Sequence, residues 1–448
     1  MLFNSQNKMI NEINKSPNIN ILSIVFALLP AFLISGPLLS EICIILLILV
    51  FLYFKIFNLK NFDLFKFSCC FFIFYLSINI SSFFSPDIFL SLKSSLSYVR
   101  FYLFILAIFF LITLNQKTLI YFKISLTIII ILLFADSTFQ LISGKNILGF
   151  ELLRPNNVLR VSSFFGDELI MGSFVVRFLP ILLGLILLTE INIIKKNIFF
   201  FSILFFSSYL ILISGERLAF VYLTIIYLIF FFFLNFGKLL KIGILITILI
   251  ATIFVFNFHP NMRIIETTKK QITNLVQIDN KFIKKRKFHL VSDQHMAHLG
   301  TAYKIFVDNP IFGKGIKSFR YVCDDKKYKS NVKKVVSEYG NEVEYDSCST
   351  HPHNTYMQLL SETGLFPAIL IFVIFLGSIY QIIKISMRNK KNQSKIKNTN
   401  NFHILILTSI IINFFPFLPS GNFYNNWLSI VYSIPIGIYL GTMKQLKV

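Results

Sequence analysis

The sequence predicts an all-α, polytopic integral membrane protein, and three observations lead to this fold class. Of its 448 residues, 55% are hydrophobic and only 14% are charged, whereas soluble domains carry about 25% charged residues. The mean hydropathy is +0.70. Apolar stretches close to the roughly 20 residues that a membrane-crossing helix needs recur along nearly the whole chain. Because lipid offers no hydrogen bonds to the backbone, such stretches are expected to be helices.

The apolar stretches predict about twelve transmembrane helices, separated by short polar connections. In chain order they cover residues 19–35, 38–57, 67–84, 94–114, 118–141, 168–189, 197–213, 218–235, 242–258, 356–383, 402–418 and 427–443. We therefore expect three parts: an N-terminal bundle of about nine spans over 1–258, a large loop over 259–355, and C-terminal helices over 356–448. No small-residue cleavage site follows the first stretch, so we expect it to remain as a span.

Basic residues are distributed unevenly between alternate connections. One side carries Lys8, Lys15, Lys55, Lys60, Lys66, Lys117, Lys123, Lys195, Lys196, Lys238, Lys241, the cluster at 384–397, Lys444 and Lys447. The short connections of the other side carry chiefly Lys93, Lys145, Arg154, Arg160 and Arg217. The positive-inside rule then predicts an inner-membrane protein with both termini cytoplasmic and the large loop periplasmic. Because the basic residues are distributed in this way, we do not interpret the net charge of +22 as a sign of nucleic-acid binding. We expect contacts with membrane lipids and none with nucleic acid.

The large outward loop is expected to be structured in parts. Residues 262–276 show the spacing of an interfacial amphipathic helix, and a second helix is expected near 294–307, before a glycine-rich turn at 309–315. Residues 326–346 are polar and mixed in charge, which predicts an exposed excursion. Cys323 and Cys348 are candidates for a disulfide, because the outer compartment permits one.

The segment from His351 to Gly364 is the most informative, because it lies where the outward loop re-enters the membrane. Pro352 and Asn354 suit the start of a helix, and from Tyr356 the apolar positions continue into the next span. His353 would then lie near a helix N-terminus at the aqueous surface. A surface histidine beside a helix cap is the alternative interpretation of the segment taken alone.

Single arginines add a second indication of function. Arg160 and Arg217 are expected at outward helix ends, and Arg100 and Arg177 lie within apolar spans. An ionisable residue in or at the membrane is costly, so each is a functional candidate, and the planar guanidinium suits phosphate oxygens.

The alternative for the arginines is a pair with an acid: Glu216 for Arg217, and Asp136 or Glu168 for Arg177. Asp293, His295 and His298 form a loose metal-like group, but without a fourth ligand we favour a solvated loop there and expect no metal site.

His353 and Asn354, followed after nine residues by Gly364, resemble the signature of the bacterial O-antigen ligases and the related O-antigen polymerases. The resemblance covers about 154–380, and it departs from the ligase pattern at Pro367. It implies a metal-independent glycosyltransferase without a cofactor, acting in cell-surface polysaccharide synthesis. The donor would be a glycan on undecaprenyl diphosphate, and the acceptor either the lipid A core or a second lipid-linked glycan. Ligase and polymerase stay undecided.

We assign roles on this basis. His353 would be the general base, and Arg217 and Arg160 would hold the diphosphate, with Arg154 and Arg320 as further candidates for the clamp or for sugar contacts.

The supporting residues have open roles. His351 could support His353, bind the acceptor or be structural; Asn354 would orient the histidine or cap the helix; Glu362 would face the cavity or a partner helix. The competing function is a transporter of lipid-linked glycans or small solutes, which would also explain many spans and buried arginines.

Overall fold

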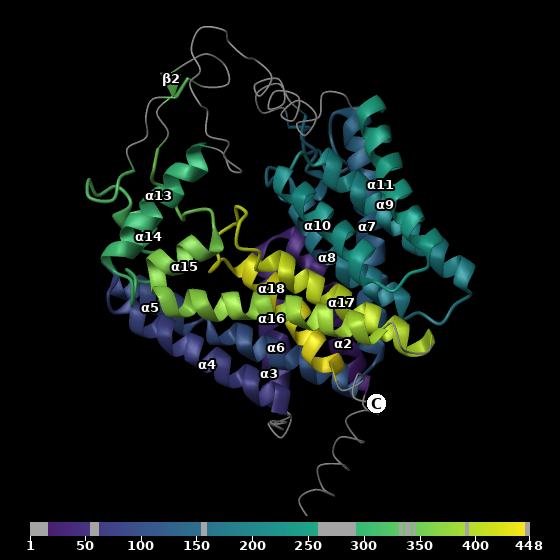
Figure 1. Ribbon diagram of the computed structural model, residues 1–448, viewed down its shortest axis with the longest axis horizontal. Coiled ribbons are helices and arrows are strands. Elements are labelled where there is room, and N and C mark those ends of the chain that lie inside the picture. The colour runs from purple at the N-terminus through teal and green to yellow at the C-terminus, as the bar shows by residue number, and fades with distance from the viewer. Residues whose placement is uncertain are drawn as a thin grey trace, which may run out of the picture.

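The computed structural model describes residues 17–53, 62–153, 159–258, 293–330, 335–336, 342–343, 346–389 and 394–443. These residues are almost entirely helical (Figure 1). The strands among them are the two-residue β1 (Val335–Val336) and β2 (Glu342–Val343), paired antiparallel with Val335 opposite Val343. The predicted interfacial helix at 262–276 lies outside the described residues.

Each of the predicted apolar stretches coincides with a long helix. The helices are α2 (Pro17–Ser35), α3 (Pro37–Tyr53), α4 (Phe62–Ser82), α6 (Val99–Leu114), α7 (Lys117–Ser143), α8 (Met171–Leu187), α9 (Ile193–Ile213), α10 (Arg217–Phe233), α11 (Lys238–Phe258), α16 (Leu365–Asn389), α17 (Ser394–Asn413) and α18 (Asn426–Thr442). Shorter elements are α5 (Ile88–Leu96), the 3₁₀ turn η2 (Ser163–Phe165), α13 (Asp293–Asp308), α14 (Phe319–Val322) and α15 (Thr355–Thr363).

Two predicted spans are broken, which corrects their boundaries. The stretch expected at 94–114 is preceded by the separate helix α5, which ends at Leu96 before α6 begins at Val99. The stretch expected at 356–383 is divided at Gly364 into α15 and α16. Gly364 has φ +80°, a left-handed conformation that ends a helix and that only glycine adopts without strain.

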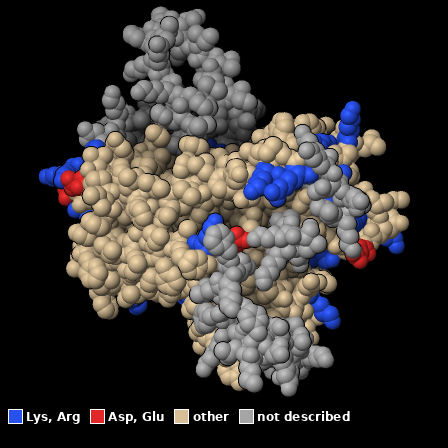
Figure 2. Space-filling view, turned by 60° about the horizontal axis from the view of Figure 1, so that its bottom comes forward, with Lys and Arg blue, Asp and Glu red and all other residues tan. Residues whose placement is uncertain are grey.

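Six helical segments within the described residues are long and apolar enough to cross a membrane. They are Asp63–Ser82, Ile88–Leu114, Lys117–Ser143, Ile193–Ile213, Lys238–Asn257 and Leu365–Arg388. Large apolar side chains are exposed along them, for example Leu76 at 59% and Leu249 at 57%, and Figure 2 shows a surface of mostly uncharged residues with few Lys and Arg. Such a surface suits lipid. The total of about twelve crossings stays a prediction.

The bundle has a buried centre and one covered end. Every residue of α8 is buried, and α9, α17 and α7 pack around it. At one end of the bundle, α13, α14 and α15 lie over the region where α4 meets α5 (Figure 1). Lys117 and Lys238 begin α7 and α11, whereas Arg217 begins α10. The helices thus place these two lysines at the opposite end of the bundle from Arg217.

Candidate functional site

The start of α15 holds His353 in a defined position. Asn354 is the N-cap residue: its side-chain oxygen accepts hydrogen bonds from the backbone N–H groups of Tyr356 and Met357, both at 3.0 Å. Its amide nitrogen donates to the carbonyls of Pro416 and Leu418, at 2.9 and 3.0 Å. Of the two roles expected for Asn354, the structure therefore shows the helix cap, and the cap also ties α15 to the segment before α18.

His353 itself has an uncommon backbone conformation. Its φ is +55°, and its carbonyl accepts a hydrogen bond of 2.8 Å from the backbone N–H of Ser420. A non-glycine residue in the left-handed region costs on the order of 1–3 kcal/mol and is found mainly where the surrounding structure requires it, often at functional sites. The conformation directs the imidazole away from α15 and toward α13.

Four histidines meet at this point. The His353 ring lies 4.1 Å from that of His351, 5.3 Å from that of His295 and 5.2 Å from that of His298, between ring centroids. His295 and His298 are three residues apart on α13 and so project from one face of that helix. His298 is only 2% exposed. The solvated-loop interpretation of these two histidines is therefore wrong, because α13 packs directly on α15.

The histidines favour their neutral forms. Burial, followed by the charges of the three neighbouring histidines, lowers the pKa of His353 to about 3. Burial also lowers the pKa of His351 to about 4, with a smaller contribution from Arg320. An unprotonated imidazole can accept a proton, so each ring is in the form that a general base requires at neutral pH.

Two exposed arginines flank the histidines. Arg217 is the first residue of α10, and its charge contributes to the lowered pKa of His295. Arg320 lies on α14, and its charge acts on His351. The fold thus brings cations from two segments about 100 residues apart to one histidine cluster. Arg154 lies outside the described residues.

Arg160 differs from the expectation, because its guanidinium is occupied by the protein. The residue is 8% exposed, and it donates to the carbonyls of Ser214 and Leu169, at 3.2 and 3.3 Å. This arrangement holds the turn between α9 and α10, from which Arg217 projects. Arg160 is therefore placed to position Arg217.

Glu216 and Asp136, two of the acids that could have paired with arginines, accept hydrogen bonds from other residues. The Glu216 carboxylate accepts hydrogen bonds from the backbone N–H groups of Gly172 and Ser173, at 2.6 and 3.2 Å, so it caps the N-terminus of α8. Arg177 donates to Asn413 and to the carbonyl of Ser173, both at 3.0 Å. Among the residues that the structure describes, neither Arg217 nor Arg177 forms a salt bridge with Glu216, Asp136 or Glu168, the pairs of the alternative interpretation.

The glycine-rich turn packs backbone to backbone against the end of α15. The N–H of Gly315 donates to the carbonyl of Glu362 at 2.7 Å, and the N–H of Leu365 donates to the carbonyl of Pro310 at 2.9 Å. A Cβ atom on Gly364 would lie 2.0 Å from the carbonyl oxygen of Ile311, and one on Gly313 would lie 2.4 Å from the carbonyl carbon of Glu362. The glycine-rich turn at 309–315 and the end of the His351–Gly364 segment, which are separate in the sequence, thus contact each other directly.

Glu362 is buried at this contact and supports α14. One carboxylate oxygen accepts from the backbone N–H of Phe319 at 3.3 Å, and the other accepts from the side chain of Gln358 at 3.0 Å. Burial raises the pKa of Glu362 to about 7. Of the two orientations expected, toward the cavity or toward a partner helix, the structure shows the second, because the carboxylate faces Phe319, the first residue of α14.

A disulfide joins Cys323 to Cys348, with 5.0 Å between their Cα atoms. The candidate pair proposed from the sequence is thus present in the structure. Cys323 follows α14 and is fully buried with Phe319 and Ile305, while Cys348 precedes His351 by three residues. The bond therefore links the segment that carries Arg320 to the segment that carries His351.

Replacing both Cys323 and Cys348 by serine should destabilise this region. Closing a loop of 25 residues is expected to contribute about 3 kcal/mol, so the thermal midpoint should fall and His351 and Arg320 should lose their fixed spacing. The measurement is thermal unfolding of purified protein with and without reductant. A control is Cys69→Ser, an exposed thiol outside the site; if the double variant unfolds at the same temperature as this control, the stabilising role is excluded.

Within the described residues, no three His, Cys, Asp or Glu side chains are arranged to hold a metal ion. The cluster's functional groups are therefore imidazoles and guanidinium ions. Sequence reasoning identified His353, Arg217 and Arg320 but missed His295 and His298 as members, although their spacing of three on an expected helix was a usable signal.

Residues 202–373 match the family described as O-antigen ligase. This segment is an O-antigen ligase domain. It begins in α9 and ends in α16, and it contains Arg217, the glycine-rich turn and all four clustered histidines. The resemblance predicted from His353, Asn354 and Gly364 is thereby confirmed. No curated protein matches the chain.

The O-antigen ligase domain and the apolar helices together support a multi-pass bacterial membrane protein that carries a domain of the ligase and polymerase type. Its activity class is that of a membrane glycosyltransferase in cell-surface polysaccharide and lipopolysaccharide biosynthesis. Lipid-linked glycans and the lipid A core are the general substrates of this class.

Proposed function

We propose that the protein transfers a glycan from undecaprenyl diphosphate to an acceptor hydroxyl without a metal ion, using His353 as general base and Arg217 as the principal diphosphate ligand. The observation that carries the proposal is the convergence of His353 with Arg217 and Arg320 at one end of the bundle. Arg160 and Glu362 position these arginines. Arg154 is a further candidate for the diphosphate. His351 supports His353 or contacts the acceptor.

The reaction is balanced with these groups alone. The acceptor hydroxyl attacks the anomeric carbon, the bond from that carbon to the diphosphate oxygen breaks, and His353 takes the hydroxyl proton. The leaving undecaprenyl diphosphate gains negative charge, which the guanidinium of Arg217 stabilises. General base catalysis and charge stabilisation of this kind each contribute about a hundredfold or more.

The low pKa of His353 fits this role. A base with a pKa of about 3 is neutral but weak. A diphosphate held nearby by Arg217 would bring negative charge to the cluster, and negative charge raises the pKa of an imidazole. His353 would therefore become a stronger base when the donor is bound.

The site also supports the enzyme over the transporter. Transport sites lie near the middle of the bilayer, in broken helices, whereas the histidines and both exposed arginines belong to α13, α14 and the N-terminal ends of α10 and α15. Since the lysines of the short connections lie mostly at the opposite end, we propose that this end is periplasmic and that both termini are cytoplasmic. We also propose that the chain is divided into an N-terminal membrane bundle (1–258), a periplasmic loop (259–355) and C-terminal membrane helices (356–448). The protein is a ligase if its acceptor is the lipid A core and a polymerase if its acceptor is a second lipid-linked glycan.

Transfer in membranes supplied with an undecaprenyl diphosphate-linked oligosaccharide tests the proposal. We expect Arg217→Ala to lower transfer at least about a hundredfold and a chelator to have no effect. Arg388→Ala, an exposed arginine near the other end of α16, is the matched control. Product length separates one ligation from a polymer ladder. Full activity of Arg217→Ala would disprove the assigned clamp, and uptake of the lipid-linked glycan without transfer would favour the transporter.

The pH dependence of kcat/KM should lack the acidic limb of an ordinary histidine. This parameter reports the free enzyme, and an unprotonated His353 is required. With the pKa of His353 at about 3, the base stays unprotonated from pH 8 down to pH 5. A histidine with the usual pKa near 6.5 would lose roughly 30-fold over that range.

Burial raises the pKa of Glu362 to about 7, so protonation of this carboxyl also affects the pH profile of the unmodified protein. Measuring the same profile in Glu362→Gln removes that effect. An acidic limb near pH 6.5 that persists in Glu362→Gln would contradict the role of His353 as a desolvated base.

A further inference from the structure

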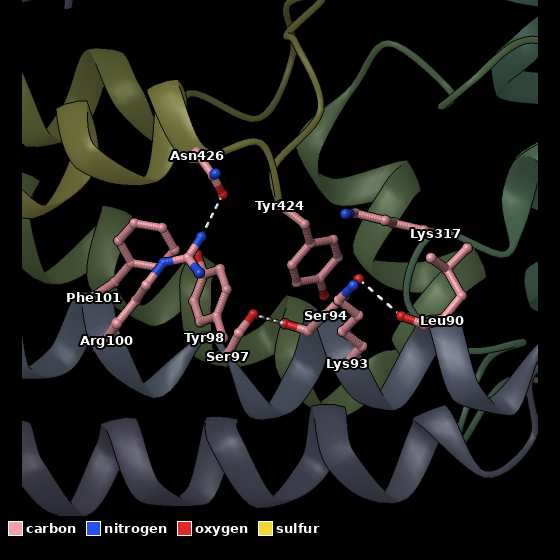
Figure 3. A pocket seen from close by; sticks show the side chains of 10 residues that line it. All are labelled: Leu90, Lys93, Ser94, Ser97, Tyr98, Arg100, Phe101, Lys317, Tyr424 and Asn426. Carbon is pink, nitrogen blue, oxygen red and sulfur yellow. Dashed lines mark hydrogen bonds between the residues drawn. The ribbon is translucent and has the colours of Figure 1, made fainter. Parts of the chain in front are cut away.

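A cationic cavity lies outside the histidine cluster, with a volume of about 280 Å³. It opens between α5, the start of α6, the turn that carries Lys317 and the start of α18. Figure 3 shows Lys317 extending toward Tyr424, while Arg100 reaches Asn426 on another side. The lining contains three cations, Lys93, Arg100 and Lys317, and no acid. None of the proposed catalytic or diphosphate ligands lines it.

The charges in this cavity are only partly compensated. Arg100 has Glu41 at 3.7 Å, yet its Nε is buried without a hydrogen-bond partner among the described residues. Burial lowers the pKa of Lys317, and the charges of Arg320, Arg100 and Lys93 lower it further, whereas the charge of Glu362 raises it. Within the described part of the chain, neither Lys93 nor Lys317 forms a salt bridge. A bound anion would relieve this repulsion.

The backbone at Lys317 is a second, independent indication. Lys317 has φ +61°, as unusual for a lysine as the conformation of His353 is for a histidine. Such strain persists where the structure fixes a side chain in one direction. The neighbouring Gly315, at φ +89°, lies so close to Ser85 and Ser91 that a Cβ atom would meet them at 2.5 and 2.9 Å. The turn is therefore pressed onto α5, and this contact places Lys317 over the cavity.

The helix α5, which lines the cavity, exposes large apolar side chains. Its small polar residues Ser91 and Ser95 are completely buried, whereas Phe89 is 80% exposed and Leu96 is 54% exposed. A helix with small polar residues inward and large apolar residues outward is suited to contact lipid chains. Lys93, on the same helix, is exposed at the cavity.

We propose that this cavity binds the phosphate group of a membrane lipid, with Lys93, Lys317 and Arg100 as its ligands and the exposed face of α5 beside the lipid chains. The site is separate from the transfer reaction, so binding can be measured without the donor glycan.

The test is native mass spectrometry of the full chain in detergent, titrated with phosphatidic acid and, in parallel, with phosphatidylcholine. We expect preferential binding of phosphatidic acid, weakened about tenfold or more in Lys93→Gln/Lys317→Gln, since charge-assisted hydrogen bonds to two cations are lost. The control, Lys384→Gln/Arg388→Gln, removes two cations from the distant part of α16 and should bind as the unmodified protein does.

Competition with inorganic phosphate separates the sources of the phosphate group. Displacement of phosphatidic acid only by a large excess of inorganic phosphate supports a lipid site. If inorganic phosphate alone binds as tightly as the lipid, the lipid assignment is wrong. Equal binding of both lipids, or unchanged binding by Lys93→Gln/Lys317→Gln, would overturn the proposal. Retained thermal stability of the double variant shows that weaker binding is not a folding defect.

Discussion

Replacing His353 by asparagine or alanine should lower the rate of glycan transfer by about a hundredfold to ten-thousandfold. The physical reason is the loss of the group that takes the acceptor proton, in a site whose other histidines point at the same ring. Asparagine is the sharper substitution, because it tolerates the left-handed conformation observed at this position, φ +55°. Transfer by each variant, at saturating donor, is the measurement.

Three controls make the His353 result interpretable. The thermal midpoint of His353→Asn should equal that of the unmodified protein, and donor binding should persist because Arg217 is intact. Added imidazole should restore part of the activity, since a small base can enter the space that the side chain leaves. Transfer within threefold of normal in His353→Asn would rule out the base assignment, and loss of both stability and donor binding would point to a structural role.

Replacing Gly364 by alanine should disrupt the site by a different route. The added Cβ would lie 2.0 Å from the carbonyl oxygen of Ile311, a distance that no rotamer can relieve because the backbone fixes the position of the Cβ and the oxygen is a backbone atom. The left-handed conformation at φ +80° adds about 1–2 kcal/mol for any L residue with a side chain. We expect a total destabilisation of at least about 3 kcal/mol, with loss of transfer because displacing the turn at 309–315 also shifts α14, which follows it and carries Arg320.

The matched control is Gly377→Ala. Gly377 lies within α16, and a Cβ there meets nothing within 4 Å, so alanine should leave stability unchanged or raise it slightly, by up to about 1 kcal/mol. Thermal unfolding and size-exclusion profiles of the two variants are compared in the same detergent. Equal stability of Gly364→Ala and Gly377→Ala would show that the contact between the turn and α15 does not support the fold.

The helices were predictable because lipid imposes a simple rule on sequence. A crossing helix must be apolar over its whole length, and so the stretch at 118–141 predicts α7 (Lys117–Ser143) closely. The break at Gly364 was not predicted, because the apolar positions 357 and 360 of α15 were taken as the beginning of one span that continues through α16. Only the approach of the Ile311 carbonyl explains why the chain turns there.

The candidate site was predictable in part for the same reason. His353 and Arg217 are conspicuous because ionisable residues beside apolar spans are rare. His295 and His298 were not recognised, since a polar loop gives no sign of which helix it packs against. Arg160 and Arg217 look equivalent in the sequence, and only the carbonyls of Ser214 and Leu169 near Arg160 distinguish a positioning residue from an exposed one.

The sequence by itself determined the membrane environment, the helix positions and the family, because hydropathy and the spacing of His353, Asn354 and Gly364 are local properties of the chain. Tertiary structure alone decided which residues meet. Bringing Arg217 of α10 beside His295 of α13, and α13 beside α15, depends on packing between segments far apart in the sequence. The desolvation that keeps the histidines neutral arises only from that packing.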